Sequence, residues 1–301
     1  MDFFLILCYT NSMNINDGPL PRKFIVQFNL DIGCNAGCFM CDKRIWDKRS
    51  NKTYINLIKL LRFLDPATVD RIKLLGGEPL LDKKGLLLFL KVCRLKGFYC
   101  LFPTNGSLFT TNYFDDLVRA GLRELTISLD SFRAEEHDTI RGLPGMFNRI
   151  ICILKYIRKQ YPDFRLNLNF LVLPQNINSL DGTISFAETL GINEFNVLYP
   201  QDFGKNFEKI QLTAFAREKI GSVKLLHSSS KMTIHWNPCN VREDFLCSYK
   251  PDKISIFEDG AINFCDHHPF KKKYKLDRPL REILEEPEIK DFLNEHLYAV
   301  S

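Results

Sequence analysis

The sequence predicts an α/β fold in which a partial, TIM-like (β/α)6 barrel is followed by a small α+β extension. Six short apolar segments alternate with segments of helical spacing, a pattern that requires parallel strands joined by helical crossovers. Eight such repeats would close a barrel, and six leave it open. The alternation stops near residue 205, so we expect a barrel unit over residues 1–205 and an extension over residues 206–301.

The predicted barrel strands are short, apolar and rich in β-branched residues. They cover residues 24–29, 71–75, 99–102, 125–129, 166–173 and 195–198. The predicted helices carry apolar residues at helical spacing, and most of them end next to proline or glycine. They cover residues 54–64, 86–96, 113–120, 146–160 and 184–190.

The predicted extension mixes helices with short strands. Its helices are expected over residues 207–226 and 280–297, and its strands over residues 232–235, 254–257 and 261–264. The last two strands flank Glu258-Asp259-Gly260, a sequence typical of a hairpin turn.

Composition and charge restrict the class of protein. Of 301 residues, 45% are apolar and 26% charged, which is typical of a globular enzyme and excludes a disordered or fibrous chain. The net charge of +5 is mild, so we expect no nucleic-acid partner. No apolar run reaches the roughly 18 residues of a membrane span, and residues 1–9 lack the features of a signal peptide. We therefore expect a cytoplasmic protein whose ten cysteines are reduced.

Three cysteines follow the first predicted strand at the spacing C-x3-C-x2-C: Cys34, Cys38 and Cys41. Gly33 and Gly37 allow the backbone between them to curl around a bound group. A tetrahedral zinc ion would need a fourth ligand, such as a nearby aspartate. A [4Fe–4S] cluster instead can be held by three thiolates, with one iron left open for an exogenous ligand.

This loop resembles the signature of the radical S-adenosylmethionine (SAM) superfamily. The resemblance implies an enzyme that binds a [4Fe–4S] cluster with an open iron site together with SAM. It also implies the reaction: reductive cleavage of SAM to a 5′-deoxyadenosyl radical, which abstracts a hydrogen atom from the substrate. The implied reductant is a flavodoxin or ferredoxin.

Two further segments resemble SAM-binding motifs of the same family. Gly76-Gly77-Glu78-Pro79 follows the second predicted strand. Its glycines let the backbone approach a ligand, and Glu78 offers an anionic acceptor to the SAM ammonium group. Thr104-Asn105-Gly106 ends the third predicted strand and resembles the family's TNG turn. The resemblance places Asn105 among the residues that bind the cofactor.

Two more motifs come later in the family's order. Ser128-Leu129-Asp130 ends the fourth predicted strand, and the two-residue period of a strand puts Ser128 and Asp130 on the same side. By the resemblance, both contact the ribose or carboxylate of SAM. Arg141-Gly142 precedes the predicted helix that starts at Met146, and Arg141 would bind the SAM carboxylate. All these segments follow strand ends, where an α/β barrel collects its active site.

Cys247, Gly260 and Cys265 give the spacing C-x12-G-x4-C. It resembles the opening of SPASM and twitch domains, which hold auxiliary iron–sulfur clusters. A full SPASM domain continues with four more cysteines, but none follows Cys265. We therefore expect one auxiliary [4Fe–4S] cluster with Cys239 as third ligand; an empty domain and a zinc site using the adjacent His-His pair are the alternatives. The other cysteines are expected to pack in the core: Cys8, Cys93, Cys100 and Cys152.

The short cysteine set at the C-terminal end also bears on the substrate. It resembles the cysteine set of enzymes that modify ribosomally made peptides. Modification of such a peptide is therefore our leading interpretation. The first alternative is a dehydrogenase or epimerase acting on a small molecule such as a sugar or alcohol. A role in molybdenum-cofactor synthesis is disfavoured, because the chain lacks a C-terminal cysteine pair and Gly-Gly tail. A non-catalytic Fe–S or zinc-binding regulator is also disfavoured, because it would have no use for the SAM-binding segments.

Overall fold

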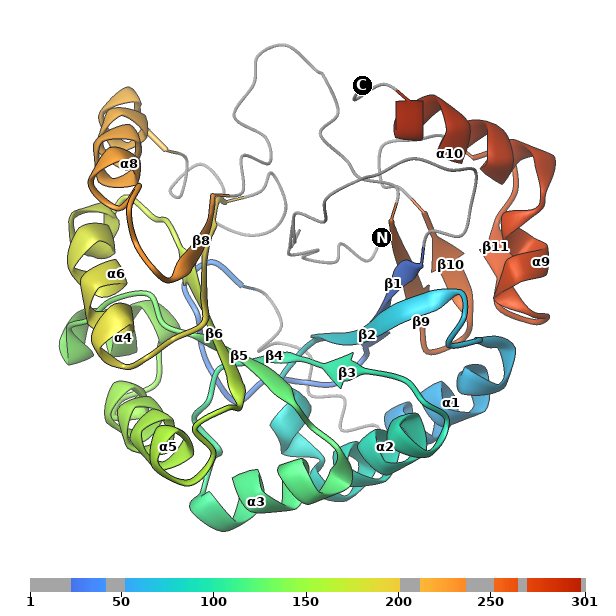
Figure 1. Ribbon diagram of the computed structural model, residues 1–301, viewed down its shortest axis with the longest axis horizontal. Helices are drawn as coiled ribbons and strands as arrows, with labels where there is room; N and C mark the ends of the chain where they lie inside the picture. Colours follow the sequence, from blue (N-terminus) through green and yellow to red (C-terminus); the bar gives the residue numbers. More distant parts are fainter. Residues whose placement is uncertain (1–22, 42–51, 201–211, 237–251, 265–269, 299–301) are drawn as a thin grey trace.

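The computed structural model describes residues 23–41, 52–200, 212–236, 252–264 and 270–298. Its strands form an open arc with helices along the outside (Figure 1), so the predicted open barrel is confirmed. The barrel strands are β1 Phe24–Leu30, β2 Val69–Gly76, β3 Cys100–Leu101, β4 Pro103–Thr104, β5 Glu124–Ser128, β6 Arg165–Leu171, β7 Glu194–Leu198 and β8 Thr233–Trp236. The remaining strands are β9 Lys253–Phe257, β10 Ala261–Asn263 and β11 Tyr274–Lys275.

Helices connect the barrel strands and cover the outer face of the arc (Figure 1). They are α1 Thr53–Leu60, α2 Lys83–Leu95, α3 Thr111–Ala120, α4 Ala134–Arg141, α5 Met146–Gln160, α6 Leu180–Thr189 and α8 Ala214–Leu226. Beside the hairpin of the extension lie α9 Leu280–Leu284 and α10 Pro287–Tyr298. Short 3-10 turns are η2 Leu61–Phe63, η3 Pro79–Leu81 and η4 Ile177–Ser179. None of these helices is long and apolar enough to cross a bilayer.

The strands pair into two sheets that meet at one residue. The first has the order β11-β10-β9-β1-β2-β3 and the second β4-β5-β6-β7-β8. Only Phe102 separates β3 from β4, and its carbonyl accepts a hydrogen bond from Thr126 of β5 at 3.3 Å. The predicted third strand is therefore present as two halves, one in each sheet.

Alternation along the strands separates the apolar core from the barrel interior. On β1, Phe24, Val26, Phe28 and Leu30 belong to the apolar core between sheet and helices. The intervening residues, among them Gln27 and Asn29, therefore face the interior of the arc. Parallel strands with one face covered by helices place every strand's carboxyl end at the same rim, which we call the mouth.

Two strands of the predicted extension hydrogen-bond to the barrel sheet. β8 pairs in parallel with β7, and β9 pairs in parallel with β1, at the opposite edge of the arc. β9 and β10 pair antiparallel around Gly260, as the turn sequence predicted. The division into units at residue 205 stays a proposal.

Three details of the secondary structure differ from the sequence prediction. The single helix expected over residues 280–297 is two helices, because Pro287 cannot continue α9 but is well suited to begin α10. Helix α4 was not predicted from the sequence. Only His137 and Ile140 of its eight residues are buried, so its apolar residues show little helical periodicity. Strand β11 was also missed, as it is only two residues long and lies in a lysine-rich segment.

Candidate active site

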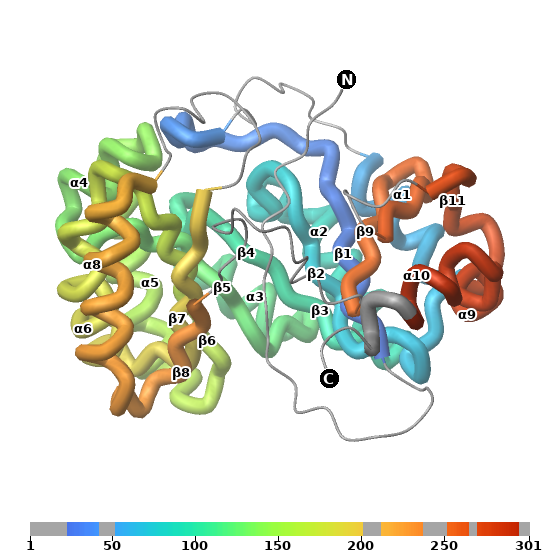
Figure 2. The backbone as a smooth tube through the Cα atoms, turned by 90° about the horizontal axis from the view of Figure 1, so that it is seen from above, coloured from blue at the N-terminus to red at the C-terminus, as the bar shows by residue number. Residues whose placement is uncertain are grey.

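The three cysteines after β1 lie at the mouth of the barrel. Figure 2 shows the blue segment that follows β1 running across to the side where α4 lies. Cys34, Cys38 and Cys41 are all partly exposed. The amide of Cys41 donates to the carbonyl of Cys38 at 3.2 Å, which begins the predicted curl of the loop.

The predicted Gly-Gly-Glu-Pro segment packs directly against this loop. A Cβ atom on Gly76 would lie 2.3 Å from the carbonyl oxygen of Leu30, and one on Gly77 would lie 2.1 Å from that of Gly33. The Glu78 amide donates to the Gly33 carbonyl at 3.0 Å. The two glycines are therefore required for a close approach of two backbones, in addition to any approach of a ligand.

Glu78 is buried and its carboxylate binds the protein itself. It accepts hydrogen bonds from the Leu80 amide at 3.0 Å, the Thr104 hydroxyl at 2.6 Å and the Asn105 amide at 2.8 Å. Desolvation raises the pKa of Glu78, and these three hydrogen bonds act against the rise. Glu78 thus fixes the turn after β4; its contact with a SAM ammonium group stays a prediction.

Asn105 links that turn to Cys34. Its side-chain amide nitrogen lies 2.9 Å from Asn35 Oδ1 and 3.7 Å from Cys34 Sγ. Its Oδ1 accepts from the Ser107 amide at 2.9 Å. We call Glu78, Thr104 and Asn105 the Cys34 side of the site.

The other end of the loop is held by Arg141 and Asp130. Arg141 Nε lies 2.6 Å from Asp130 Oδ2, and Arg141 Nη1 lies 3.9 Å from Cys38 Sγ. Burial alone would lower the pKa of Arg141, but the charges of Asp130 and Cys38 outweigh burial and raise it. The guanidinium is therefore a permanent cation beside the cysteine loop.

The backbone on either side of Arg141 also contacts the cysteine loop. The Phe39 amide donates to the Ile140 carbonyl at 3.1 Å. Gly142 has φ +60°, and a Cβ atom there would lie 2.4 Å from the Gly37 carbonyl oxygen. Both residues of the predicted Arg-Gly segment thus contact the cysteine loop, Arg141 at Cys38 and Gly142 at Gly37.

Asp130 and Ser128 do not have equivalent positions. Ser128 is the last residue of β5 and is partly buried, whereas Asp130 is fully buried. Asp130 Oδ1 accepts from the Leu171 amide at 2.9 Å while Oδ2 faces Arg141. The two-residue period does not extend to Asp130, because the strand ends first. Direct contacts of both residues with SAM stay predictions, and Asp130 positions Arg141 in the structure.

Two residues that sequence reasoning missed hold Asp130 in place. The Asp130 amide donates to His137 Nδ1 at 3.1 Å, and Asn176 Nδ2 donates to the Asp130 carbonyl at 2.9 Å. Burial lowers the pKa of His137 to about 4, so the ring is neutral and its Nδ1 accepts. No motif marks either residue. We call Asp130, Arg141 and His137 the Cys38 side of the site.

The chemistry of the donor set fits an iron–sulfur cluster. Burial raises the pKa of Cys34 to about 12, and the charges of Glu78, Cys38 and Cys41 add to the rise. Three thiolates that repel one another favour a bound cation, because metal binding offsets their repulsion. Among the described residues, no three Cys, His, Asp or Glu side chains are grouped for a single metal ion. A cluster needs no such grouping, since each iron takes one thiolate.

Polar side chains line the barrel interior below the mouth. Within the described residues, Gln27 Nε2 and Asn29 Nδ2 are buried without a hydrogen-bond partner. Lys73 of β2 is also buried, and desolvation, reinforced by the charge of Lys253, lowers its pKa to about 7. On the opposite wall, Asn196 Nδ2 donates to Asn169 Oδ1 at 3.1 Å. The wall formed by β1 and β2 therefore presents hydrogen-bond donors to the interior.

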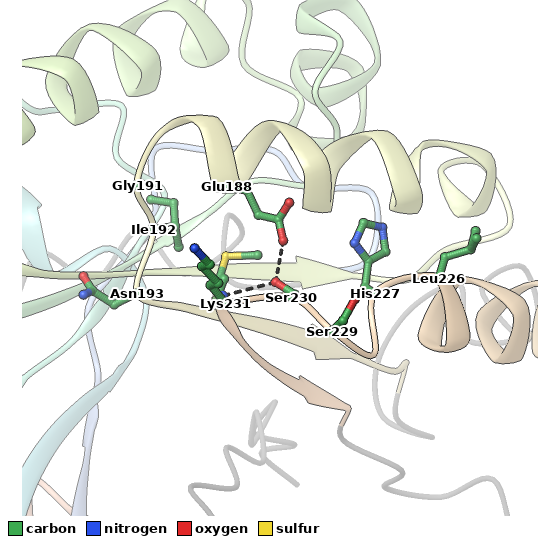
Figure 3. A pocket seen from close by; sticks show the side chains of 10 residues that line it. Glu188, Gly191, Ile192, Asn193, Leu226, His227, Ser229, Ser230 and Lys231 are labelled. Atoms are coloured by element: carbon green, nitrogen blue, oxygen red, sulfur yellow. Dashed lines mark hydrogen bonds between the residues drawn. The ribbon is translucent and has the colours of Figure 1, made fainter.

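A separate hollow of about 670 Å³ lies at the opposite end of the barrel. Figure 3 shows Glu188 and Ser230 in contact within it, next to Gly191 and His227. These residues lie where α6 and α8 end and β7 and β8 begin. That end of an α/β barrel serves stability rather than catalysis.

The remaining cysteines divide into three groups. Cys239, Cys247 and Cys265 lie outside the described residues, as does Cys8. Cys93 and Cys100 are buried as predicted. The prediction for Cys152 was wrong: it is exposed, because it lies on the outer face of α5 between buried Ile150 and Ile153.

An open parallel barrel with a three-cysteine loop at its mouth defines the class of protein. The Radical SAM superfamily matches residues 29–187, more than half of the chain. The chain therefore belongs to the radical SAM superfamily, as the cysteine loop predicted. Enzymes of this family bind a [4Fe–4S] cluster and SAM.

Relatives in this family have different substrates. The chain is 27% identical over 203 residues to an AdoMet-dependent heme synthase of Methanosarcina barkeri, covering 66% of this chain and 56% of the relative. It is 30% identical over 243 residues to a GTP 3′,8-cyclase of Campylobacter jejuni, covering 77% and 72%. The chain thus spans little more than half the length of the heme synthase.

The fold is similar to that of SuiB from Streptococcus suis in its complex with S-adenosylmethionine. The TM-score is 0.72 at 17% identity, and the match covers 90% of this chain and 68% of SuiB. SuiB has also been solved with its precursor peptide SuiA. At this identity the likeness shows a shared fold.

Proposed function

We propose that this protein is a radical SAM enzyme that cleaves SAM reductively and abstracts a hydrogen atom from a ribosomally made peptide. One observation carries the proposal: the segments after β2, β4 and β5 all contact the cysteine loop that follows β1. A loop that only bound a metal would not need the buried carboxylate of Glu78 on one side and the ion pair of buried Asp130 with Arg141 on the other.

In this proposal, Cys34, Cys38 and Cys41 hold the [4Fe–4S] cluster. When bound together with SAM, the cluster supplies the electron that generates the 5′-deoxyadenosyl radical, which takes a hydrogen atom from an unreactive C–H bond. The cation of Arg141 lies beside Cys38, where it would stabilise an anionic group such as the SAM carboxylate. Gly76 and Gly77 leave room for backbone contacts with the same cofactor.

A small apolar cluster beneath the loop keeps water away from the site. It contains Met40, Ile140, Leu171, Leu173 and Leu198, with Cys38 and Phe39 packed against it. These residues come from the cysteine loop, α4, β6 with the loop that follows it, and β7. Exclusion of water prevents side reactions of a radical and strengthens the electrostatic contacts of Arg141.

The interior donors support a substrate rich in acceptor groups. Gln27 Nε2 and Asn29 Nδ2 are satisfied by no described residue, and a buried unpaired donor costs about 1–3 kcal/mol. Carbonyl oxygens of a peptide entering the barrel would relieve that cost. The resemblance of the fold to SuiB, which binds a precursor peptide, supports the same substrate class.

A second candidate is a small-molecule substrate. The curated relatives favour it, since their names assign them heme synthesis and cyclisation of GTP. The donor wall of Gln27, Asn29 and Lys73 would then bind a carboxylate or phosphate. A small-molecule dehydrogenase or epimerase belongs to this class as well.

The three cysteines of the predicted auxiliary site lie outside the described residues. Cys239, Cys247 and Cys265 would hold one auxiliary [4Fe–4S] cluster. Anaerobically reconstituted protein should then contain about eight irons per chain, and about four if the auxiliary site is empty. The electron donor would be a flavodoxin or ferredoxin.

The decisive experiment is formation of 5′-deoxyadenosine by the anaerobic protein with SAM and dithionite. Replacing Cys34, Cys38 and Cys41 together by Ala should abolish the product and remove about four irons. Product formation at the wild-type rate in this variant would refute the proposal. Replacement of exposed Cys152 by Ala is the matched control and should change neither quantity.

The same assay distinguishes the two substrate classes. Peptides encoded beside this gene should raise 5′-deoxyadenosine formation and gain a modification visible by mass spectrometry. Stimulation by GTP, with no response to any such peptide, would favour the small-molecule class instead.

A further inference from the structure

The outer surface of α1 and α2 carries two parallel stripes of cations and exposed aliphatic side chains. On α2, Lys84, Leu88, Lys91 and Leu95 follow one another at helical spacing, and all four are exposed. Leu88 is 49% exposed and Leu95 is 82% exposed. A surface helix ordinarily places such leucines against the core.

The neighbouring stripe, on α1, also combines cations with an exposed aliphatic side chain. Ile55, Lys59 and Arg62 lie on one face of α1 and the turn after it, and all are exposed. Helices α1 and α2 pack side by side (Figure 1). The two stripes together form one surface, which we call the α1/α2 surface.

The charge of this surface is of one sign. Neither α1 nor α2 contains an acidic residue. Lys83 pairs with Asp116 of α3 at 2.7 Å, but within the described residues Lys59, Lys84 and Lys91 have no acidic partner. A solvated face usually mixes both signs, whereas unneutralised cations interleaved with aliphatic groups are typical of a surface for an acidic partner.

The α1/α2 surface begins at the mouth, beside the cysteine loop. α2 starts just after the Gly-Gly-Glu-Pro segment, and the Tyr54 hydroxyl in the first turn of α1 donates to the Pro79 carbonyl at 2.9 Å. That segment packs on the loop through Gly77 and Glu78. A protein bound to the starts of both helices would therefore lie next to the three cysteines.

We propose that the α1/α2 surface binds an acidic one-electron carrier protein that reduces the cluster held by the cysteine loop. The inference rests on the proposed function, which requires an electron at that loop. The cations attract and orient the carrier, and the aliphatic side chains between them are buried on contact. The partner class follows from the sign of the charge and from the position of the surface.

The test compares two reductants in the same full-length, reconstituted protein. Lys84→Glu combined with Lys91→Glu should lower 5′-deoxyadenosine formation driven by reduced flavodoxin roughly tenfold, because charge reversal at a contact slows association. Formation driven by dithionite, which needs no docking surface, should stay at the wild-type rate. Raising the salt concentration should lower the rate at which the wild type forms 5′-deoxyadenosine with reduced flavodoxin, because salt screens the attraction between the two proteins.

The control variant combines Lys155→Glu and Lys159→Glu on α5. These two exposed lysines lie four residues apart on one face of a different helix. Both rates should equal those of the wild type. Leu88→Gln removes one exposed aliphatic group without altering charge, and it should lower only the flavodoxin-driven rate.

Each alternative outcome is distinct. Equal flavodoxin-driven rates in wild type and the α2 variant would overturn the inference. The same equality, together with loss of binding to phosphatidylserine vesicles in the variant, would assign the surface to a membrane instead. Absence of product in the wild type with dithionite would refute the proposed function itself, because that arm involves no carrier protein.

Discussion

The two sides of the cysteine loop are held by different kinds of interaction. On the Cys34 side, Glu78 accepts three hydrogen bonds from uncharged donors, and glycines allow close backbone contact. On the Cys38 side, Arg141, whose side chain is 13% exposed, forms an ion pair with the fully buried Asp130. Loss of one hydrogen bond leaves the others in place, whereas loss of one ion leaves an uncompensated charge. We therefore expect the Cys38 side to be the more sensitive.

The largest effect is expected for Arg141→Met. Asp130 would be left as a buried unpaired charge, so the free energy of unfolding should fall by about 3–5 kcal/mol in urea denaturation. The double variant with Asp130→Asn should recover part of this loss. Arg119→Met breaks an exposed ion pair with Asp116 and should cost at most about 1 kcal/mol. Equal losses in the two single variants would contradict the comparison.

His137 gives the Cys38 side a pH dependence of its own between pH 4 and 6.5. Its pKa is about 4 in the folded protein and 6.5 in the unfolded chain. Because the folded pKa is depressed, its contribution is fully present above pH 6.5 and is lost as the pH falls towards 4. The loss should reach on the order of 3 kcal/mol, measured as unfolding free energy against pH.

His137→Gln separates this titration from the hydrogen bond. Glutamine keeps an acceptor for the Asp130 amide but cannot be protonated in this range. The variant should lose less stability than the wild type between pH 6.5 and 4. An unchanged pH profile would show that His137 is not the titrating group.

On the Cys34 side, Glu78→Gln should cost about 1–3 kcal/mol. In either orientation, the new amide group directs N–H at a donor, the amide of Leu80 or that of Asn105. Glu135→Gln, on the exposed first turn of α4, is the matched control and should have almost no effect on unfolding. A cost for Glu78→Gln above that of Arg141→Met would reverse the proposed ranking of the two sides.

The sequence predicted the parts of this site that depend on local pattern. The alternation of strands and helices located the mouth, and the cysteine spacing together with Gly76-Gly77-Glu78 identified the loop and its neighbour. What it could not predict are pairings between distant elements. His137 and Asn176 come from a weakly periodic helix and a loop, and only the fold brings them to Asp130.

The edges of the sheet show the same limit. The strands around residues 232–235 and 254–257 were expected correctly, but no local pattern shows that they pair with β7 and β1 at opposite edges of the barrel. Pro287 is the opposite case, because the break between α9 and α10 follows from proline chemistry alone.

The smallest effect is expected for Asn105→Ala, which tests the outer contact of the Cys34 side. The substitution removes the hydrogen bonds to Asn35 and from the Ser107 amide, and the N–H group 3.7 Å from Cys34 Sγ, so stability should fall by about 1–2 kcal/mol. Hydrogen bonds to cysteine sulfur raise the reduction potential of an iron–sulfur cluster, because they stabilise the more negative reduced state. The potential of the reconstituted cluster should therefore shift to a more negative value, measured by a redox titration followed by electron paramagnetic resonance. Asn35→Ala also removes the bond between the two asparagines but leaves the Asn105 N–H beside Cys34. It should leave the potential unchanged, and an equal shift in both variants would assign the effect to loop geometry rather than to the N–H group.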